Sequence, residues 1–211
     1  MLEIRVDVRI KSPSYAHKLG VCIQPIYYGV DWSHFIYFFE YWIHEGATLF
    51  ILYIESYVKE LEFIFQLYQK IGNLEIEFVN FSILPTNANN LKQNPNNYVH
   101  RLEPHLAMFD CLHRARGRAM YVAQTDLDEM FLNSPMILLR EFNFNSFYNS
   151  QLETNFTLFQ YNKLIYRPER VKKFEIHSKN QYEVDPETHK QYEHIIIDPH
   201  EAIKLHLRFD I

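Results

Sequence analysis

The feature that most constrains the fold is a continuous apolar run, ATLFILYI, at Ala47–Ile54. A run of this length without polar interruption is typical of a strand buried on both faces of a sheet. The preceding segment, Asp31–Gly46, has apolar residues at helical spacing, with Asp31 as a candidate N-cap and Gly46 as a stop. A buried strand beside an amphipathic helix favours a parallel sheet covered by helices.

The rest of the chain continues this alternation. We predict strands at Gly20–Tyr28, Leu74–Asn80 and Ala119–Thr125, helices at Tyr57–Gly72 and Glu103–Arg116, and a loop over the Asn- and Pro-rich stretch Pro85–His100. The predicted fold class is therefore α/β, a mostly parallel sheet flanked by helices. We predict a single domain over 20–211 after an N-terminal extension at 1–19. Ligands of such sheets bind beyond the carboxyl ends of the strands.

Composition excludes several classes of protein. The net charge is −5 and no basic run is present, which disfavours nucleic-acid binding. No segment has the roughly 20 apolar residues of a membrane helix, and no leader opens the chain, so it reads as soluble. The two cysteines, Cys22 and Cys111, are interpreted as small buried hydrophobes, with a disulfide left open.

Three acids follow the predicted strand that ends at Thr125: Asp126, Asp128 and Glu129. On an extended backbone, Asp126 and Asp128 would project to one side while Leu127 turns back to the core. Two such carboxylates repel each other unless a cation lies near them, and oxygen ligands suit Mg²⁺ or Mn²⁺. We interpret this Asp-x-Asp motif as a site where a metal ion holds a diphosphate.

Other interpretations of the acids are a solvated turn, a phosphatase with Asp126 as nucleophile, and a glycosidase pair of carboxylates. A calcium loop is excluded because Met130 stands where an acid or Asn is needed and no Gly follows it.

A series of motifs extends along most of the chain from about Gly20. They are Asp110-Cys111, then Asp126-Leu127-Asp128-Glu129, then Arg167-Pro168-Glu169 with His177, and finally His206 and Arg208. In this order they resemble glycosyltransferase family 92. The resemblance implies a GT-A fold, a divalent cation, usually Mn²⁺, and inverting transfer of galactose from UDP-galactose to a glycan or glycoprotein.

The resemblance also implies roles for particular residues. Metal ligands would be Asp126, Asp128 and His206, and donor-binding residues would be Pro25, Tyr27, Tyr28, Asp110, Arg114, Asp126 and Arg167, with Lys163 as a further cation. Several of these residues have an alternative role. The alternatives are packing for Tyr28, an ion pair with Arg114 for Asp110, and solvation for the cations. For His206, and likewise for His177, the alternative is a structural strand or core position. Inversion needs a general base. Glu129 and Asp198 are the candidates, with Asp185 and Glu187 also available, and the sequence does not choose among them.

Three features depart from the resemblance. Relatives are commonly Golgi proteins with an N-terminal anchor, whereas about twenty residues precede the first predicted strand, so we expect a fragment, an incomplete gene model or an unusual soluble form. The segment between Leu132 and Lys163, which should build the acceptor side, is short, and the chain stops soon after His206. The alternative function is therefore a truncated or inactive member that binds nucleotide-sugar, glycan or a partner without turnover.

Overall fold

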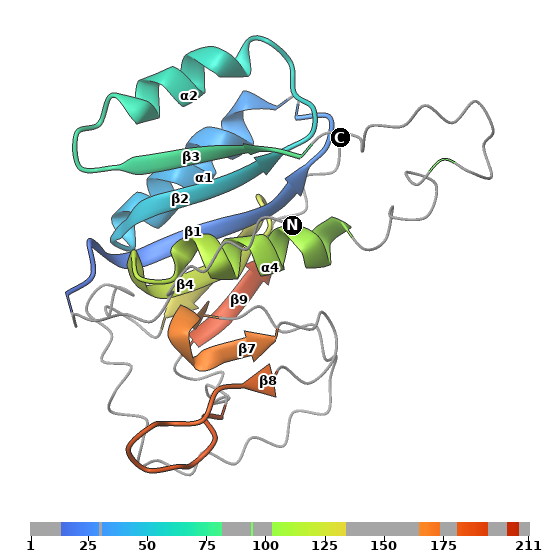
Figure 1. The fold of residues 1–211 in the computed structure, drawn as a ribbon. Coiled ribbons are helices and arrows are strands. Elements are labelled where there is room, and N and C mark those ends of the chain that lie inside the picture. The colour runs from blue at the N-terminus through green and yellow to red at the C-terminus, as the bar shows by residue number, and fades with distance from the viewer. Residues whose placement is uncertain are drawn as a thin grey trace.

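The computed structural model describes residues 14–29, 31–81, 94, 103–133, 165–173, 181–193 and 202–206, and Figure 1 shows how its elements are arranged. Within these residues a five-stranded sheet has the order β3-β2-β1-β4-β6. The strands are β1 (His17–Ile26), β2 (Ala47–Ile54), β3 (Glu75–Asn80), β4 (Ala119–Thr125) and β6 (Ile165–Tyr166). β1 pairs in parallel with both β2 and β4, β2 pairs in parallel with β3, and only β6 is antiparallel. The predicted α/β fold with a mostly parallel sheet is confirmed.

Helices cover both faces of the sheet (Figure 1). α1 (Trp32–His44) and α2 (Leu61–Gln69) pack on one face, and α4 (Glu103–Ala115) packs on the other. Successive residues of β2 divide between the faces: Phe50 and Leu52 pack in the α1–α2 core, whereas Leu49 and Ile51 pack against α4. β2 is therefore continuously apolar because both of its faces are buried.

Aromatic side chains fill the space between the sheet and the two helices α1 and α2. Phe35, Phe39 and Trp42 of α1 are all 0% exposed. The ring of Phe39 stacks on that of Tyr68 of α2, with centroids 4.3 Å apart, and lies 5.2 Å from the ring of Phe50. Burial of each such side chain contributes roughly 1.5–3 kcal/mol, so these contacts hold both helices against β2.

α1 begins and ends where the sequence predicts. Oδ1 of the N-cap residue, Asp31, accepts a hydrogen bond of 2.8 Å from Ser33 N–H. The Ser33 hydroxyl and N–H both donate to this carboxylate, which lowers the pKa of Asp31. After the helix, Gly46 has a φ of 93°, a conformation that glycine adopts without strain.

α2 begins four residues later than predicted, at Leu61 instead of Tyr57. Tyr57 forms a parallel bridge with Gly29, and Val58 N–H donates to Gly29 O at 2.8 Å. The pairing of β1 with β2 thus continues beyond both strands and keeps these residues out of the helix. The close approach also explains Gly29, where a Cβ atom would lie 3.2 Å from Ile26 Cγ2.

The remaining elements form two small antiparallel pairs, β5 with β9 and β7 with β8. They are β5 (Glu129–Asn133), a short 3-10 helix (Pro168–Arg170), β7 (Val171–Lys173), β8 (Gln181–Tyr182) and β9 (Ala202–His206). Apart from Asn94, the predicted loop Pro85–His100 lies outside the described residues. Among the residues described, no helix has the length and apolar character needed to cross a membrane.

Candidate active site

The acidic segment forms a tight turn at the carboxyl end of β4. β4 ends at Thr125, and the N–H of Glu129 donates to Asp126 O at 3.3 Å, which closes the turn before β5 begins. Leu127 packs against the core, as predicted. The extended geometry expected for Asp126 and Asp128 is wrong, because the chain reverses at these residues. Both remain partly exposed within a single turn.

Buried polar groups hold this turn. The Thr125 hydroxyl lies 3.1 Å from Asp126 O and 3.3 Å from Glu129 O, and it is placed to donate to these carbonyl oxygens. Oε2 of Glu129 accepts a hydrogen bond of 3.1 Å from Asp126 N–H. Glu129, a candidate base, is only 2% exposed. Its carboxylate thus lies inside the turn and fixes the backbone of Asp126.

Strand pairing places the backbone of His206 next to the acidic turn. In the antiparallel pair of β5 and β9, His206 is directly opposite Glu129. Glu129 and His206, which are 77 positions apart in sequence, therefore pair one residue away from Asp128. Two carboxylates and an imidazole-bearing residue are donor types that suit Mn²⁺. Among the side chains that the structure describes, no group of three His, Cys, Asp or Glu residues gathers as a metal site.

The end of β1 lies at the same edge of the sheet. Ile23 pairs with Thr125, so the residues that follow β1 and β4 emerge side by side. Tyr27 and Tyr28 are 40% and 83% exposed there, whereas Pro25 is buried. Tyr28 has a φ of 50°, which is uncommon for a residue other than glycine, and its N–H donates to Ser56 Oγ at 2.9 Å. The structure therefore exposes two tyrosine side chains, but not Pro25, at the edge of the sheet where the acidic turn lies.

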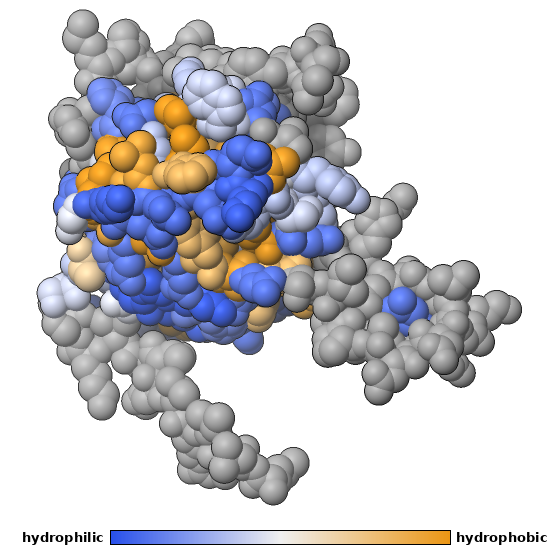
Figure 2. Space-filling model, turned by 90° about the horizontal axis from the view of Figure 1, so that it is seen from above, coloured by the Kyte–Doolittle hydropathy of each residue, from blue (hydrophilic) through white to orange (hydrophobic). Residues whose placement is uncertain are grey.

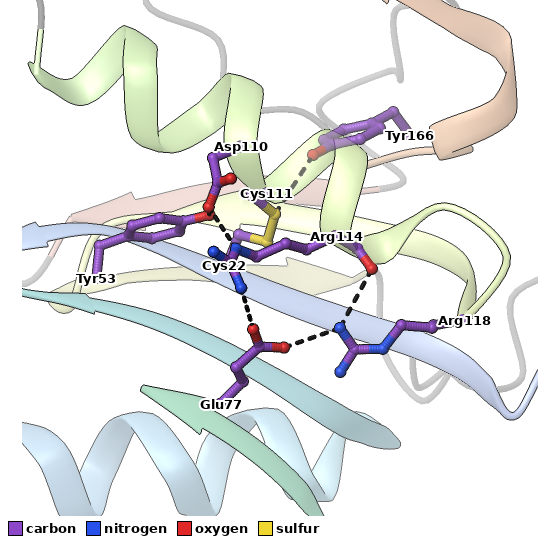
Figure 3. Close-up of a disulfide and its surroundings, with 8 residues drawn as sticks. All are labelled: Cys22, Tyr53, Glu77, Asp110, Cys111, Arg114, Arg118 and Tyr166. Atoms are coloured by element: carbon purple, nitrogen blue, oxygen red, sulfur yellow. Dashed lines mark hydrogen bonds and ion pairs between the residues drawn. A yellow bond between two sulfur atoms is a disulfide. The ribbon is translucent and has the colours of Figure 1, made fainter. Parts of the chain in front are cut away.

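Asp110 and Arg114 form an ion pair on α4 (Figure 3). Asp110 also accepts a hydrogen bond of 2.8 Å from the Tyr53 hydroxyl, and Arg114 pairs with Glu77 of β3. Burial and the hydrogen bond to Asp110 raise the pKa of Tyr53, so it stays a donor. The hydrogen bond to Asp110 is also the main cause that raises the pKa of Arg114. The pair thus fixes α4 to β2 and β3, and its contact with a nucleotide stays a prediction.

The same chain of ion pairs continues to the amino ends of the strands. Arg118 donates to Glu77 at 2.8 Å and to Glu75 at 2.7 Å. Glu75 also lies 2.7 Å from Nε2 of His17, whose Nδ1 lies 2.9 Å from the Thr48 hydroxyl. This network ties β1, β2, β3 and α4 together, and no local sequence pattern predicts it.

Cys22 and Cys111 form a disulfide, so the interpretation of two separate buried hydrophobes was wrong (Figure 3). Their Cα atoms are 6.4 Å apart, and the residues are 1% and 0% exposed. Cys22 lies on the face of β1 that α4 covers, which brings it opposite Cys111. The sequence indicates only that Cys22 and Cys111 fall on inward-facing positions of a predicted strand and a predicted helix. Whether the helix covers the face of the sheet on which Cys22 lies depends on the tertiary fold.

Arg167 lies away from the acidic turn. Its guanidinium carbon is 5.8 Å from the ring centroid of Tyr121, and its Nη2 lies 3.5 Å from the Tyr15 hydroxyl. Tyr121 precedes Thr125 by four residues of β4, which corresponds to roughly 13 Å along a strand. The structure therefore does not bring Arg167 to the carboxyl edge.

Of the other candidate bases, Asp185 and Glu187 lie in the loop that follows β8, and Asp198 lies outside the described residues. Asp185 accepts hydrogen bonds from the Thr188 N–H at 2.7 Å and from the Tyr192 hydroxyl, and the Tyr192 bond is the main cause that lowers its pKa. A lowered pKa makes Asp185 a weak proton acceptor near neutral pH. Glu187 is exposed in the same loop. Lys163, His177 and Asp198 lie outside the described residues.

The structure thus defines an α/β domain with an acidic turn at the carboxyl edge of its central parallel strands, where domains of this class bind their ligands. The model of Glycosyltransferase family 92 matches residues 17–150. The chain therefore belongs to glycosyltransferase family 92. No curated protein matches the chain. Membership supports a glycosyltransferase role, with a sugar donor and a glycan acceptor.

Proposed function

We propose that this chain transfers a hexose, galactose from UDP-galactose, to a hydroxyl group of a glycan and that the reaction depends on Mn²⁺ or another divalent cation. The supporting observation is the position of the acidic turn. Asp126 and Asp128 share one turn beyond β4, and β4 pairs with β1, whose end carries Tyr27 and Tyr28. A nucleotide diphosphate can span this edge, with the base near the tyrosines and the diphosphate near the acids.

The donor types in the turn fit a hard divalent cation. Asp126 and Asp128 supply carboxylate oxygens, and His206 is a further candidate ligand from its register opposite Glu129. When bound, the ion would neutralise the charge that develops on the departing diphosphate. Because so few protein ligands leave most coordination positions open, we expect the ion and the nucleotide to bind together.

The tyrosines are proposed to contact the nucleotide base. The Tyr28 ring is exposed, and its backbone is fixed in a left-handed conformation by the hydrogen bond to Ser56. An exposed aromatic ring on a fixed backbone can stack on a base, and only the side chain itself then has to be ordered. Tyr27 lies beside it on the same edge.

Inverting transfer requires that the acceptor hydroxyl lose its proton to a base. Glu129 is bound to the Asp126 backbone inside the turn. Hydrogen bonding lowers the pKa of Asp185. We therefore propose Asp198 as the first residue to test as the base.

Calorimetric titration tests this function. We expect UDP and UDP-galactose to bind in the presence of Mn²⁺, and Asp128→Asn to weaken binding by at least tenfold. Glu60→Gln, which removes one carboxylate from the exposed start of α2, is the matched control and should bind as the unaltered protein does. If no UDP-sugar binds with or without Mn²⁺, the proposal fails. Binding without turnover on a panel of glycan acceptors would favour the non-catalytic alternative.

A further inference from the structure

A cavity of about 450 Å³ lies between α2 and the carboxyl ends of β2 and β3. This volume is within the range of roughly 300–1,000 Å³ that is usual for small-molecule sites. Phe65 and Phe78 contribute its apolar lining. Its polar lining comes from Glu55, Tyr57, Glu62, Gln66, Gln69 and Asn80. Figure 2 looks down on the α2 side of the molecule, where apolar and hydrophilic residues lie side by side.

The lining predicts the charge of the occupant. Glu55 and Glu62 are acidic, and no Lys, Arg or His is among the residues that line the cavity in the described part of the chain. A phosphate or another anion would be repelled. A neutral ligand with many hydroxyl groups suits carboxylate and amide side chains, because hydroxyls donate to the former and exchange hydrogen bonds with the latter. The Tyr57 ring adds an apolar face.

Asn80 is both a wall of this cavity and part of an N-glycosylation acceptor, Asn80-Phe81-Ser82. It is exposed at the end of β3. Phe81 N–H donates to Ile54 O at 2.8 Å, which fixes the backbone beside Asn80. Among the described strands, β3 pairs only with β2, so Asn80 lies on the free edge of the sheet. A bulky group attached there would meet no further strand of the sheet among those described.

The disulfide gives an independent indication of the compartment. Cys22 and Cys111 are joined across β1 and α4. Disulfides of this structural kind form and persist in the oxidising compartments of the secretory route and are rare in the cytosol. N-linked glycans are added to secretory proteins, at surface sites with this sequence pattern.

We propose that Asn80 carries an N-linked glycan and that its first sugar, an N-acetylglucosamine, lies in the cavity. In the attachment step a bond forms between Asn80 Nδ2 and C1 of the sugar. The bond from C1 to the diphosphate oxygen of a lipid-linked oligosaccharide donor breaks, the lipid diphosphate leaves, and Nδ2 loses one proton. The sugar hydroxyls then face Glu62 and Gln66, and the Tyr57 ring covers the sugar. This proposal does not depend on which sugar the chain itself transfers.

The first experiment tests attachment. The full chain is expressed behind a secretion signal in eukaryotic cells, and its mass is measured before and after a glycan-removing amidase. Ser82→Ala abolishes the acceptor but keeps Asn80, and Asn155→Gln removes the other acceptor in the sequence. We expect Ser82→Ala to lose the mass of one glycan in either background. Equal masses for Ser82→Ala and the unaltered protein would overturn the proposal.

The second experiment tests the position of the first sugar. An endoglycosidase that leaves one N-acetylglucosamine should not change the melting temperature, whereas the amidase should lower it by about 2–4 °C. Since the amidase converts Asn80 to Asp, unglycosylated Asn80→Asp is the reference for the charge it creates. Tyr57→Ala should abolish the difference between the two digests, and Glu60→Gln should retain it. If Tyr57→Ala retains the full difference, the sugar does not lie in the cavity.

Discussion

The Tyr41 hydroxyl in α1 forms two hydrogen bonds with the backbone of Phe131 in β5. It donates to Phe131 O and accepts from Phe131 N–H at 3.0 Å. The next residue of α1, Trp42, packs its ring edge-to-face on the Phe131 ring at 5.8 Å. β5 begins at Glu129, the residue that closes the acidic turn. α1 therefore holds the strand that leaves the candidate metal site.

Tyr41→Phe should destabilise the acidic turn while Asp126, Asp128 and Glu129 are all retained. A net contribution of about 1 kcal/mol per hydrogen bond predicts a loss of about 1–2 kcal/mol in the free energy of unfolding. We also expect up to tenfold weaker binding of UDP with Mn²⁺. Burial raises the pKa of Tyr41, so the hydroxyl remains a donor at working pH. Urea denaturation and calorimetry measure the two effects.

The control for this variant is Tyr37→Phe, which removes a hydroxyl from a side chain of α1 that is 50% exposed. It should leave both the free energy of unfolding and UDP binding unchanged. If Tyr41→Phe binds UDP as tightly as Tyr37→Phe does, α1 does not position the site.

Glu129→Gln separates a role in holding the turn from a role as the general base. The Glu129 carboxylate is buried and accepts from Asp126 N–H. We therefore expect this variant to weaken UDP–Mn²⁺ binding several-fold while the pH dependence of kcat is retained. Loss of a general base would instead lower kcat by roughly 10²–10⁴ and leave binding intact. Steady-state kinetics over a range of pH distinguish these two outcomes. Asp198→Asn is the comparison variant, and for it we expect a lower kcat with intact binding.

The sequence was sufficient where local patterns determine the structure. The apolar run of β2 predicted a strand buried on both faces, and Asp31 and Gly46 marked the limits of α1 correctly. The start of α2 was mispredicted because Tyr57 pairs with Gly29, a contact between residues 28 positions apart that no local pattern shows. Residues with helical periodicity can thus remain extended when their backbone pairs with a neighbouring strand.

In the candidate site, the sequence identified the acids but not their geometry. The turn at Asp126 depends on the Thr125 hydroxyl and on the buried Glu129 carboxylate, and neither contact follows from the alternation of strand residues. The sequence leaves the disulfide open, since the proximity of Cys22 and Cys111 requires knowing that α4 crosses the same face of β1. The resemblance implies a donor-binding role for Arg167, whereas the antiparallel pairing of β6 with β4 leads the chain at Arg167 away from the carboxyl end of β4.

Removal of the disulfide should lower stability more than activity. The bond closes a loop with a sequence separation of 89 residues, and cross-links of this kind typically contribute about 2–4 kcal/mol. The double variant Cys22→Ala, Cys111→Ala should lose about this amount in urea denaturation. Because both cysteines are buried, dithiothreitol should act on the unaltered protein slowly unless urea is present. The reductant should have no effect on the double variant, and an equal effect on both proteins would contradict a structural disulfide.

The ion pairs at Glu75 predict how stability depends on pH. Hydrogen bonding to His17 and then to Arg118 lowers the pKa of Glu75 below its ordinary value of 4.5. A carboxyl group with a lowered folded-state pKa stabilises the fold above the unfolded-state pKa, and this contribution is lost as the pH falls through the folded-state pKa. Glu75→Gln should therefore be less stable than the unaltered protein near neutral pH. The deficit should shrink below pH 4.5, where the unfolded chain takes up the proton more readily. Urea midpoints across this pH range measure the deficit, and the exposed Glu60→Gln is the control. A stability deficit that stays constant with pH would show that the charge of Glu75 is not the source of the deficit.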